Sequence, residues 1–379
     1  MSERRRIGGF VVVITSLWML FHVYVGLRLF GHGTIPAPWS VLAWAGLMLL
    51  ALGPVVALWA ARSGRGRPAG ELPVKRMLEV AGFTAMGLSS LLIVFALAGD
   101  ALRLRSWIGT GGFSVAVLGG ALAVLAIGVW RARRPAAVRV VDVPIADLPP
   151  DLEGFRIVQL SDLHVGATLK RDFVDRVVST ANELRPDLIA LTGDVADGFP
   201  RELRDEVAPL AALRAPHGKY FVTGNHEYYW DAAGWVRELE ELGFDALVNR
   251  HRVIYQGAAR IVVAGVTDLS SGGLAGHRSD PAAAVAGAPA SDVKLLLAHQ
   301  PKSAFAARAA GYDLQLSGHT HGGQYFPFNL LVRLFQPFVA GLHRLEAMWL
   351  YVSRGTGYWG PPLRLGAPAE ITLIQLTRA

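Results

Sequence analysis

The sequence predicts an all-α membrane region followed by an α/β domain, and three observations support this order. Long apolar runs fill the first 135 of the 379 residues, and short β-branched runs alternate with helical segments afterwards. The net charge also changes sign. The first 135 residues carry 14 Lys and Arg against 4 Asp and Glu, and the remainder carries 23 against 26. We therefore expect two domains, residues 1–135 and residues 136–379.

Composition excludes several classes of protein. Hydrophobic residues make up 52% of the chain and charged residues 18%, which excludes a disordered protein. The chain contains no Cys, so disulfides and thiolate metal sites are excluded, and any metal must be held by His, carboxylate or amide groups. The basic residues form short clusters beside long apolar runs, which is typical of membrane flanks, and we expect no nucleic-acid partner.

Four apolar stretches are long enough to cross a bilayer as helices, which takes about 20 residues. The first follows Arg4, Arg5 and Arg6 but is too long for a signal peptide, and no small-residue cleavage site precedes the second. The predicted spans are Gly8–Phe30, Ser40–Ala61, Met77–Ala98 and Ile108–Trp130.

The distribution of cations predicts the orientation. The N-terminus, the Arg62–Arg76 loop and the Arg131–Arg134 cluster together hold 11 Lys and Arg. We expect an integral protein of the inner or cell membrane, with the N-terminus and everything after Pro135 in the cytoplasm. A loosely inserted third span, which contains Glu79, would reverse this placement. The opposite side holds Arg28, Arg103 and Arg105.

His22 and Glu79 are the residues of these spans that can titrate near neutral pH. An ionisable group inside a membrane is a candidate functional group. Neither has an evident charged partner in the sequence, so we expect both to be structural. The alternative function is a transporter or sensor module with a regulatory, catalytically inactive metal-binding domain. Broken spans in repeated halves would favour it, and the sequence shows no such repeat.

After Val138 the pattern changes to short β-branched runs, typical of buried strands, and to helical segments such as Lys170–Leu184. This alternation predicts an α/β domain. The Ala- and Gly-rich stretch Gly272–Ala290 predicts a loop or a short helix. The predicted strands are Arg156–Leu160, Leu188–Leu191, Tyr220–Val222, Ile261–Val266, Val293–Ala298 and Leu314–Leu316.

Polar residues stand directly after five of these strands. Ligands of α/β sheets bind outside the carboxyl ends of the strands, so all five groups can meet in one crevice. The strand-end residues are Asp162 and His164, Asp194, Asn225 and His226, His299, and His319 with His321.

The chemistry of these groups favours a metal centre. Asp162 and His164 are two residues apart, so in an extended segment they point the same way, and the same holds for His319 and His321. Seven donors are too many for one tetrahedral ion and suit two ions that share a carboxylate. Two ions about 3.5–4 Å apart can clamp the attacking and leaving oxygens of a phosphoryl transfer. The predicted donors are Asp162, His164, Asp194, Asn225, His299, His319 and His321.

Each motif taken alone is weak evidence for a metal site, because an Asp-x-His or Gly-Asp pair often arises by chance. Five groups in this order, each after a strand, argue strongly against coincidence. Glycines beside the donors permit tight turns and close backbone approach; they are Gly193, Gly224, Gly318, Gly322 and Gly323. The histidines expected in surface or core positions are His217, His251, His277 and His343.

These residues resemble the motifs of the calcineurin-like metallophosphoesterases. The resemblance covers Arg156–Thr377, and later signatures are similar to the membrane-anchored bacterial branch of that family. The matching motifs are Asp162-x-His164, Gly193-Asp194, Gly224-Asn225-His226-Glu227, His299 and Gly318-His319-x-His321. The later signatures are Gly322-Gly323-Gln324, Val352-Ser353-Arg354-Gly355, Pro362-x-Arg364 and Pro368-x-Glu370.

The resemblance implies two mixed β-sheets in a sandwich flanked by helices, with a dinuclear site at one edge. His226 would stand near the leaving group as general acid or charge-stabilising group instead of binding metal. The implied activity is metal-dependent hydrolysis of a phosphodiester or pyrophosphate, and the mixed ligands suit Mn²⁺, Fe or Zn²⁺. By the family pattern, Asp162, His164 and His321 hold one ion, Asn225, His299 and His319 hold the other, and Asp194 bridges them.

Two features favour a lipid or membrane-adjacent phosphoester as substrate. The membrane region restricts the catalytic domain to the bilayer surface, and the apolar stretch Tyr325–Phe335 is either a lip for acyl chains or part of the core. Arg354 and Arg364 either meet a second phosphate or form ordinary salt bridges. Membrane-anchored members of the resembling family include enzymes that cleave the pyrophosphate of UDP-2,3-diacylglucosamine. This is the specific substrate that we expect, and a phosphodiesterase of unspecified substrate is the broader expectation. A catalytically dead scaffold would lack a donor, and none is missing.

Overall fold

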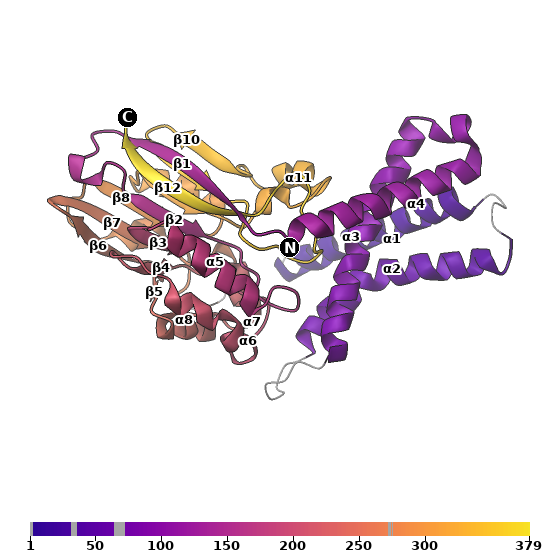
Figure 1. Cartoon of the computed structure of the whole chain (residues 1–379), viewed down its shortest axis with the longest axis horizontal. Helices are drawn as coiled ribbons and strands as arrows, with labels where there is room; N and C mark the ends of the chain where they lie inside the picture. The colour runs from indigo at the N-terminus through magenta and orange to yellow at the C-terminus, as the bar shows by residue number, and fades with distance from the viewer. Residues whose placement is uncertain (1–2, 32–35, 64–72, 272–273, 275) are drawn as a thin grey trace. The chain divides into compact units, whose positions relative to one another are not determined.

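The computed structural model describes residues 3–31, 36–63, 73–271, 274 and 276–379. The chain forms two compact units, one helical and one built on β-sheets (Figure 1). The helical unit contains Met1–Trp130 with the short segment Gly360–Leu363. The sheet unit contains Arg131–Trp359 and Arg364–Ala379, so the structural boundary lies a few residues before the predicted one.

The helical unit places each predicted span inside one long helix. All four helices are long and apolar enough to cross a membrane, so the prediction of about four transmembrane helices is confirmed on length and composition. The side chains of the cationic flanks Arg4–Arg6, Arg65 and Arg67 lie outside the part of the chain that the structure describes in full. The helices are α1 (Glu3–Phe30), α2 (Trp39–Arg62), α3 (Pro73–Ala101) and α4 (Leu104–Ala132).

Small residues bring α2 and α3 close together. A Cβ atom added to Gly82 would lie only 2.4 Å from the Gly53 carbonyl oxygen, so the two backbones touch at this point. Close approach at Gly and Ala is typical of helix packing in membranes, because apolar side chains gain little by leaving lipid tails. The pairing of α2 with α3 therefore depends on residue size.

One polar side chain of the helical unit has a partner that the sequence did not reveal. His22 is buried, its Nδ1 atom lies 2.8 Å from the Trp18 carbonyl oxygen, and its Nε2 atom lies 3.0 Å from Ser89 Oγ of α3. Both partners are uncharged groups. The contact is a hydrogen bond between two helices, and it gives His22 a structural role.

The sheet unit contains two six-stranded sheets, and each mixes parallel with antiparallel neighbours. In spatial order, the first sheet consists of β1 (Ala137–Ile145), β12 (Glu370–Arg378), β2 (Arg156–Leu160), β3 (Leu188–Leu191), β4 (Lys219–Phe221) and β5 (Asp245–Ala246). The second consists of β10 (Gly341–Leu345), β11 (Met348–Val352), β9 (Leu314–Ser317), β8 (Val293–Leu297), β7 (Ala259–Gly265) and β6 (Arg250–Gln256).

The two sheets share one apolar core. Ile157 and Leu188 of the first sheet belong to the same buried cluster as Val263, Leu295 and Leu316 of the second. Strands buried on both faces form near-continuous apolar runs, which explains why the predicted strands read LIAL and VKLLL. The sandwich that the resemblance implied is confirmed.

Helices pack on the outer faces of both sheets. Val174, Leu203 and Trp235 pack from three helices against the first sheet, and Ala284 and Ala304 pack from two helices against the second. The helices on the first sheet are α5 (Arg171–Glu183), α6 (Pro200–Val207) and α8 (Ala232–Glu241). Those on the second are α9 (Pro281–Val285), inside the stretch predicted as a loop or short helix, and α10 (Ala304–Ala309).

The parallel strands set the position of the candidate site. Strands β2, β3 and β4 run parallel in the first sheet, and β7, β8 and β9 run parallel in the second. Their carboxyl ends therefore meet at one edge of each sheet, where ligands of α/β folds bind.

Candidate metal centre

Every predicted donor follows the carboxyl end of a parallel strand. Asp162 and Asp194 follow β2 and β3, and Asn225 begins the short helix α7 (Asn225–Trp230) after β4. His299 follows β8, and His319 follows β9 together with His321, two residues further on. The structure brings all seven predicted donors together at this edge.

Several donors have a backbone conformation that L-residues seldom adopt. The φ angles are 54° at Asp162, 48° at His164, 54° at Asp194, 70° at His319 and 52° at His321. The expectation that the Asp-x-His and His-x-His segments are extended is therefore wrong, because left-handed residues turn the chain at each strand end. Such residues cost of order 1–3 kcal/mol each and persist only where the surrounding packing holds them.

Glycines allow the loops to approach the donors. A Cβ atom on Gly224 would lie 2.2 Å from Asp194 Oδ1, and one on Gly318 would lie 2.2 Å from Asp162 Oδ2. A larger residue at either position would displace a candidate ligand. The predicted role of these two glycines follows directly from these distances.

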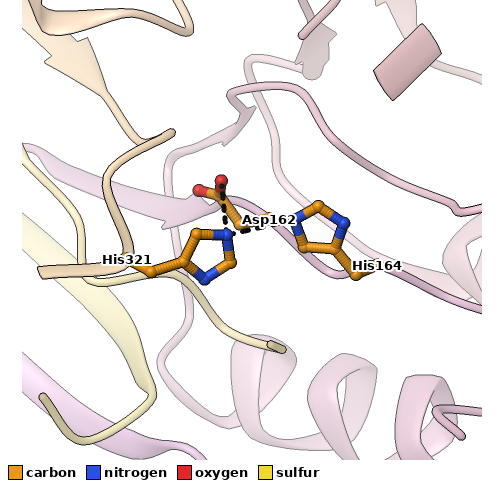
Figure 2. Close-up of side chains that lie close together, drawn as sticks. All are labelled: Asp162, His164 and His321. Carbon is orange, nitrogen blue, oxygen red and sulfur yellow. Dashed lines mark hydrogen bonds and ion pairs between the residues drawn. The ribbon is translucent and has the colours of Figure 1, made fainter. Parts of the chain in front are cut away.

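The first cluster contains Asp162, His164 and His321 (Figure 2). His321 Nε2 lies 3.3 Å from Asp162 Oδ1 and 3.1 Å from His164 Nε2. Figure 2 shows the Asp162 and His164 side chains, from the loop after β2, beside that of His321, from the loop after β9. One carboxylate oxygen and two imidazole nitrogens thus face a common point.

The second cluster contains Asn225, His299 and His319. Asn225 Oδ1 lies 3.2 Å from His299 Nε2 and 2.8 Å from His319 Nδ1, and the two histidine nitrogens are 3.3 Å apart. His319 and His321 therefore belong to different clusters, although their spacing predicted a common direction. The left-handed backbone at both residues separates their side chains.

Asp194 links the two clusters. Its Oδ2 atom lies 3.2 Å from His299 Nε2 in the second cluster and 3.7 Å from His164 Nε2 in the first. Its Oδ1 atom accepts a hydrogen bond from the His226 backbone N–H at 2.9 Å. Burial raises the pKa of Asp194, but the charges of His299, His226 and His164 outweigh burial and hold this pKa well below its usual value.

The hydrogen-bond pattern fits divalent cations. His299 Nδ1 donates to the Thr192 carbonyl oxygen at 2.8 Å, so in the neutral ring Nε2 carries a lone pair. That lone pair faces two acceptors, Asp194 Oδ2 and Asn225 Oδ1, each 3.2 Å away. A proton can fill this place, and Asp194 accordingly raises the pKa of His299 well above its usual value despite the opposing effect of burial. A metal cation can bind the His299 nitrogen and both of these oxygens at once.

Asp197 is a site residue that the sequence analysis missed. Its Oδ1 atom lies 3.2 Å from His164 Nδ1 and 2.5 Å from His226 Nδ1. It therefore orients one candidate metal ligand and the predicted catalytic histidine together. Burial lowers the pKa of His226, but Asp194 and Asp197 outweigh burial and raise this pKa to about 9.

Glu227 holds two of the loops in place. Its carboxylate accepts hydrogen bonds from the backbone N–H groups of Asp194 at 3.0 Å, Val195 at 2.8 Å and Gly224 at 2.6 Å. Burial, followed by the charge of Asp194, raises the pKa of Glu227 to about 7. Glu227 is thus a positioning residue of the Gly-Asn-His-Glu motif.

Two arginines that were considered for phosphate binding are engaged within the protein. Arg364 is 1% exposed and donates to backbone carbonyl groups, among them those of His321 and Ala367 at 3.1 Å. Arg354 Nη1 lies 2.9 Å from Glu370 Oε2. Arg354 therefore forms a salt bridge, which was one of the two alternatives, whereas Arg364 bonds carbonyl oxygens of the chain.

The remaining histidines of the sheet unit lie outside the donor clusters found among the described residues. Each has another partner: His217 bonds Gln256 Oε1 at 2.8 Å, and His251 bonds the Ala284 carbonyl oxygen at 2.8 Å. The other two contacts are His277 with the Tyr228 hydroxyl and His343 with the Ala340 carbonyl oxygen.

Comparison with known proteins gives the same assignment as the site geometry. The calcineurin-like phosphoesterase family model matches residues 155–323. A zebrafish (Danio rerio) transmembrane protein with a metallophosphoesterase domain is 41% identical over 68% of this chain and 61% of its own length. An uncharacterized metallophosphoesterase of Aquifex aeolicus is 34% identical over 60% of this chain and 87% of its own length.

The chain spans about three fifths of the length of the first of these relatives and of its bovine (Bos taurus) counterpart. Among solved structures, the NAD nucleotidase of Haemophilus influenzae has a TM-score of 0.39 at 15% identity, covering 54% of this chain and 45% of the nucleotidase.

Proposed function

This chain belongs to the calcineurin-like metallophosphoesterase family, and we propose that it is a membrane-anchored phosphohydrolase whose centre holds two divalent metal ions. The position of Asp194 carries the proposal. Its Oδ2 atom faces His164 Nε2 of one cluster and His299 Nε2 of the other. A carboxylate in that position can be shared by two cations.

The two donor clusters supply a separate set of ligands for each ion. Asp162, His164 and His321 would hold one ion, and Asn225 with the other two histidines of the second cluster would hold the second. When bound, ions such as Mn²⁺, Fe or Zn²⁺ supply Lewis acidity and make hydroxide available near neutral pH. Most of these ligands are buried, and Thr192 and Asp197 bond Nδ1 of His299 and of His164, which leaves Nε2 of each ring to bind metal.

We propose that His226 donates a proton to the leaving group. Its Nδ1 atom is taken by Asp197, so Nε2 is the ring nitrogen left for the substrate. Nε2 lies 3.9 Å from Asp194 Oδ2, beside the shared carboxylate. A histidine in this place can protonate a leaving alkoxide or phosphate oxygen.

We propose a lipid-linked phosphodiester or pyrophosphate, such as UDP-2,3-diacylglucosamine, as the substrate. The four membrane-length helices support a substrate that resides in the bilayer. Two aromatic rings also stand beside His226, with ring centroids 5.0 Å away for Tyr229 and 5.6 Å away for Trp359, and both side chains are exposed. These rings offer an apolar wall next to the reacting group.

The catalytic unit is proposed to lie on the cytoplasmic side. The supporting observation is the excess of Lys and Arg, 11 against 3, on the side of the spans that carries the N-terminus and residues after Pro135. The bilayer is then the partner of the helical unit.

Purified full-length protein tests the proposed reaction. After metal removal and reloading with Mn²⁺ or Zn²⁺, hydrolysis of a chromogenic phosphodiester, a phosphomonoester and a UDP-linked pyrophosphate would be compared. Asp194→Asn is expected to lower metal-dependent turnover by about 10³-fold, because shared metal ligation contributes several kcal/mol. Asp175→Asn, at an exposed position on α5, is the matched control and should retain activity.

Two outcomes would contradict the proposal. Equal activity of Asp194→Asn and Asp175→Asn would show that the centre is not catalytic. Two bound metal ions without turnover of any ester, in lipid as well as in detergent, would instead support the transporter or sensor module with a regulatory metal-binding domain.

A further inference from the structure

An exposed apolar segment begins at Phe326, five residues beyond the metal-ligand candidate His321. It contains the short helix α11 (Phe328–Leu331) and the helical turn η6 (Val332–Leu334), neither of which contributes a buried residue. Of the stretch Tyr325–Phe335, Tyr325 is buried as the core alternative expected, whereas exposure reaches 75% at Leu334. We call this segment the apolar lip; its exposed side chains are Phe326, Phe328, Leu330, Leu331, Leu334 and Phe335.

The apolar lip is joined to the metal centre by specific contacts. A Cβ atom on Gly323 would lie 2.1 Å from the Asn329 Cα atom, so the lip backbone touches the ligand loop. Gln324 donates to the Trp359 carbonyl oxygen at 2.9 Å and accepts from the Trp359 N–H at 3.0 Å. The Trp359 ring in turn contacts His226. The loop that leads into the lip is therefore bonded through Gln324 to Trp359, beside His226.

The charges of this region fit a bilayer surface. Residues 324–344 include Arg333 and Arg344 but no Asp or Glu. Six large apolar side chains exposed within ten residues are more than a soluble surface normally presents in one place. Aromatic and aliphatic side chains beside arginine, without acids, are typical of segments that lie in the interface of anionic membranes.

The connection between the two units keeps the bilayer within reach. Helix α4 ends at Ala132 and β1 begins at Ala137, so the connector is short. At about 3.3–3.6 Å for each extended residue, it spans less than about 20 Å. The sheet unit is thus tethered to any membrane that holds the helical unit, whereas a soluble partner must be encountered by diffusion.

We propose that the apolar lip inserts into the interface of the bilayer that anchors this chain. Insertion places the mouth of the metal centre at the level of the lipid headgroups. A lipid-linked substrate can then reach His226 and the donor clusters without leaving the membrane, and this consequence rests on the proposed function. The insertion itself does not depend on catalysis.

The absence of native Cys allows a direct test by site-directed spin labelling. Leu334→Cys would carry a nitroxide label in the full-length, zinc-loaded protein in nanodiscs containing anionic lipid. We expect the label to collide readily with oxygen and to be shielded from a water-soluble nickel reagent, as for a position within the lipid interface. Leu330→Cys is a second reporter on the same segment, should Leu334→Cys fail to assemble.

Tyr255→Cys is the matched control. Tyr255 is 60% exposed, and it pairs with Arg260 at the amino end of β7, opposite the metal edge. Its label should be accessible to the nickel reagent. Equal nickel accessibility at positions 334 and 255 would overturn the proposal, and so would shielding of position 334 from both reagents, which indicates a protein partner or a second copy.

Activity separates this inference from the proposed function. We expect Leu334→Asp to lower hydrolysis of UDP-2,3-diacylglucosamine in nanodiscs at least tenfold and to leave hydrolysis of a water-soluble ester unchanged. An equal loss on both substrates would contradict a role of the lip in substrate entry. If the unmodified protein hydrolyses neither substrate, the proposed function fails, and the spin-label result still decides the insertion.

Discussion

The helical unit and the sheet unit differ in how their polar side chains meet. In the helical unit, a group of half-buried side chains is complementary in charge and in hydrogen bonding. The Asp100 carboxylate accepts from the Tyr24 hydroxyl at 2.6 Å and pairs with Arg28 Nε at 2.6 Å. In the sheet unit, the lone pair of His299 Nε2 faces the oxygens of Asp194 and Asn225. Complementary pairs stabilise a fold, whereas a cluster of nitrogen and oxygen atoms whose lone pairs face one another indicates a cation site.

The backbone shows the same contrast. Five candidate ligands of the sheet unit have positive φ angles, although none is glycine. Within the four described membrane helices, the residue with a positive φ is Gly109, which adopts this conformation at little cost. Of the eleven non-glycine residues with positive φ in the described part of the chain, five are thus candidate donors, where the packing of two sheets can maintain the strain.

Replacing His226 should give the largest effect among changes that leave every predicted metal ligand intact. We expect His226→Gln to lower kcat by roughly 10²–10⁴-fold, the range of a general acid, while two metal ions stay bound. Steady-state kinetics with metal analysis measures both quantities. His217→Gln, at a histidine outside the clusters, is the control, and loss of metal from His226→Gln would assign this residue to ligation instead.

Metal binding should stabilise the sheet unit and not the helical one. At a free metal concentration of 100 times Kd, each site is expected to add about 2.7 kcal/mol to the free energy of unfolding. Thermal unfolding of the full chain at increasing Mn²⁺, compared between unmodified protein and Asp194→Asn, measures this gain. An equal rise of Tm in both proteins would show that the metal acts elsewhere.

Asp197 should give an intermediate effect, because it acts through the histidines that it orients. We expect Asp197→Asn to lower metal affinity or activity about 10–100-fold, as for other partners of ligating histidines. Metal titration and the pH profile of kcat would be measured together. Asp197→Glu, which keeps the acceptor, should recover part of the loss, whereas unchanged metal affinity and an unchanged pH profile would contradict the positioning role.

The smallest effect is expected in the helical unit. Ser89→Ala removes the partner of His22 Nε2, and hydrogen bonds between membrane helices contribute about 0.6 kcal/mol on average. Unfolding of the full chain in detergent should shift by about this amount, and hydrolysis of a water-soluble ester should be unchanged. A large loss of activity in Ser89→Ala would mean that the polar groups of the helical unit take part in function.

Local sequence was sufficient for the four long apolar helices and for six of the twelve strands in the two sheets, namely β2, β3, β4, β7, β8 and β9. A span requires only about 20 apolar residues in a row, and a buried strand requires a short β-branched run. Both can therefore be recognised from a short window of the sequence. Strand pairing is not local. Strand β12, at the end of the chain, lies between β1 and β2, and Val141 pairs with Ile374. No pattern within residues 370–378 indicates those neighbours.

The same limit applies to the candidate site. Glycine-flanked motifs after strands were enough to select the seven donors, because parallel strands bring their carboxyl ends together. The two-residue spacing of His319 and His321 did not indicate that their side chains belong to different clusters. Asp197 carried no signal of its own, because its place beside His164 depends on the contact that joins Val165 with Ala196.

The sequence by itself determined the membrane region, the α/β class, the metal-ligand types and the family, because these depend on residue type and order. The tertiary structure decided which donors share a cluster, that Asp197 supports two histidines, that Arg364 is buried, and that the segment after His321 is exposed. These properties arise from contacts between residues distant in the chain. Whether a Phe or Leu packs in a core or faces a membrane depends on what surrounds it.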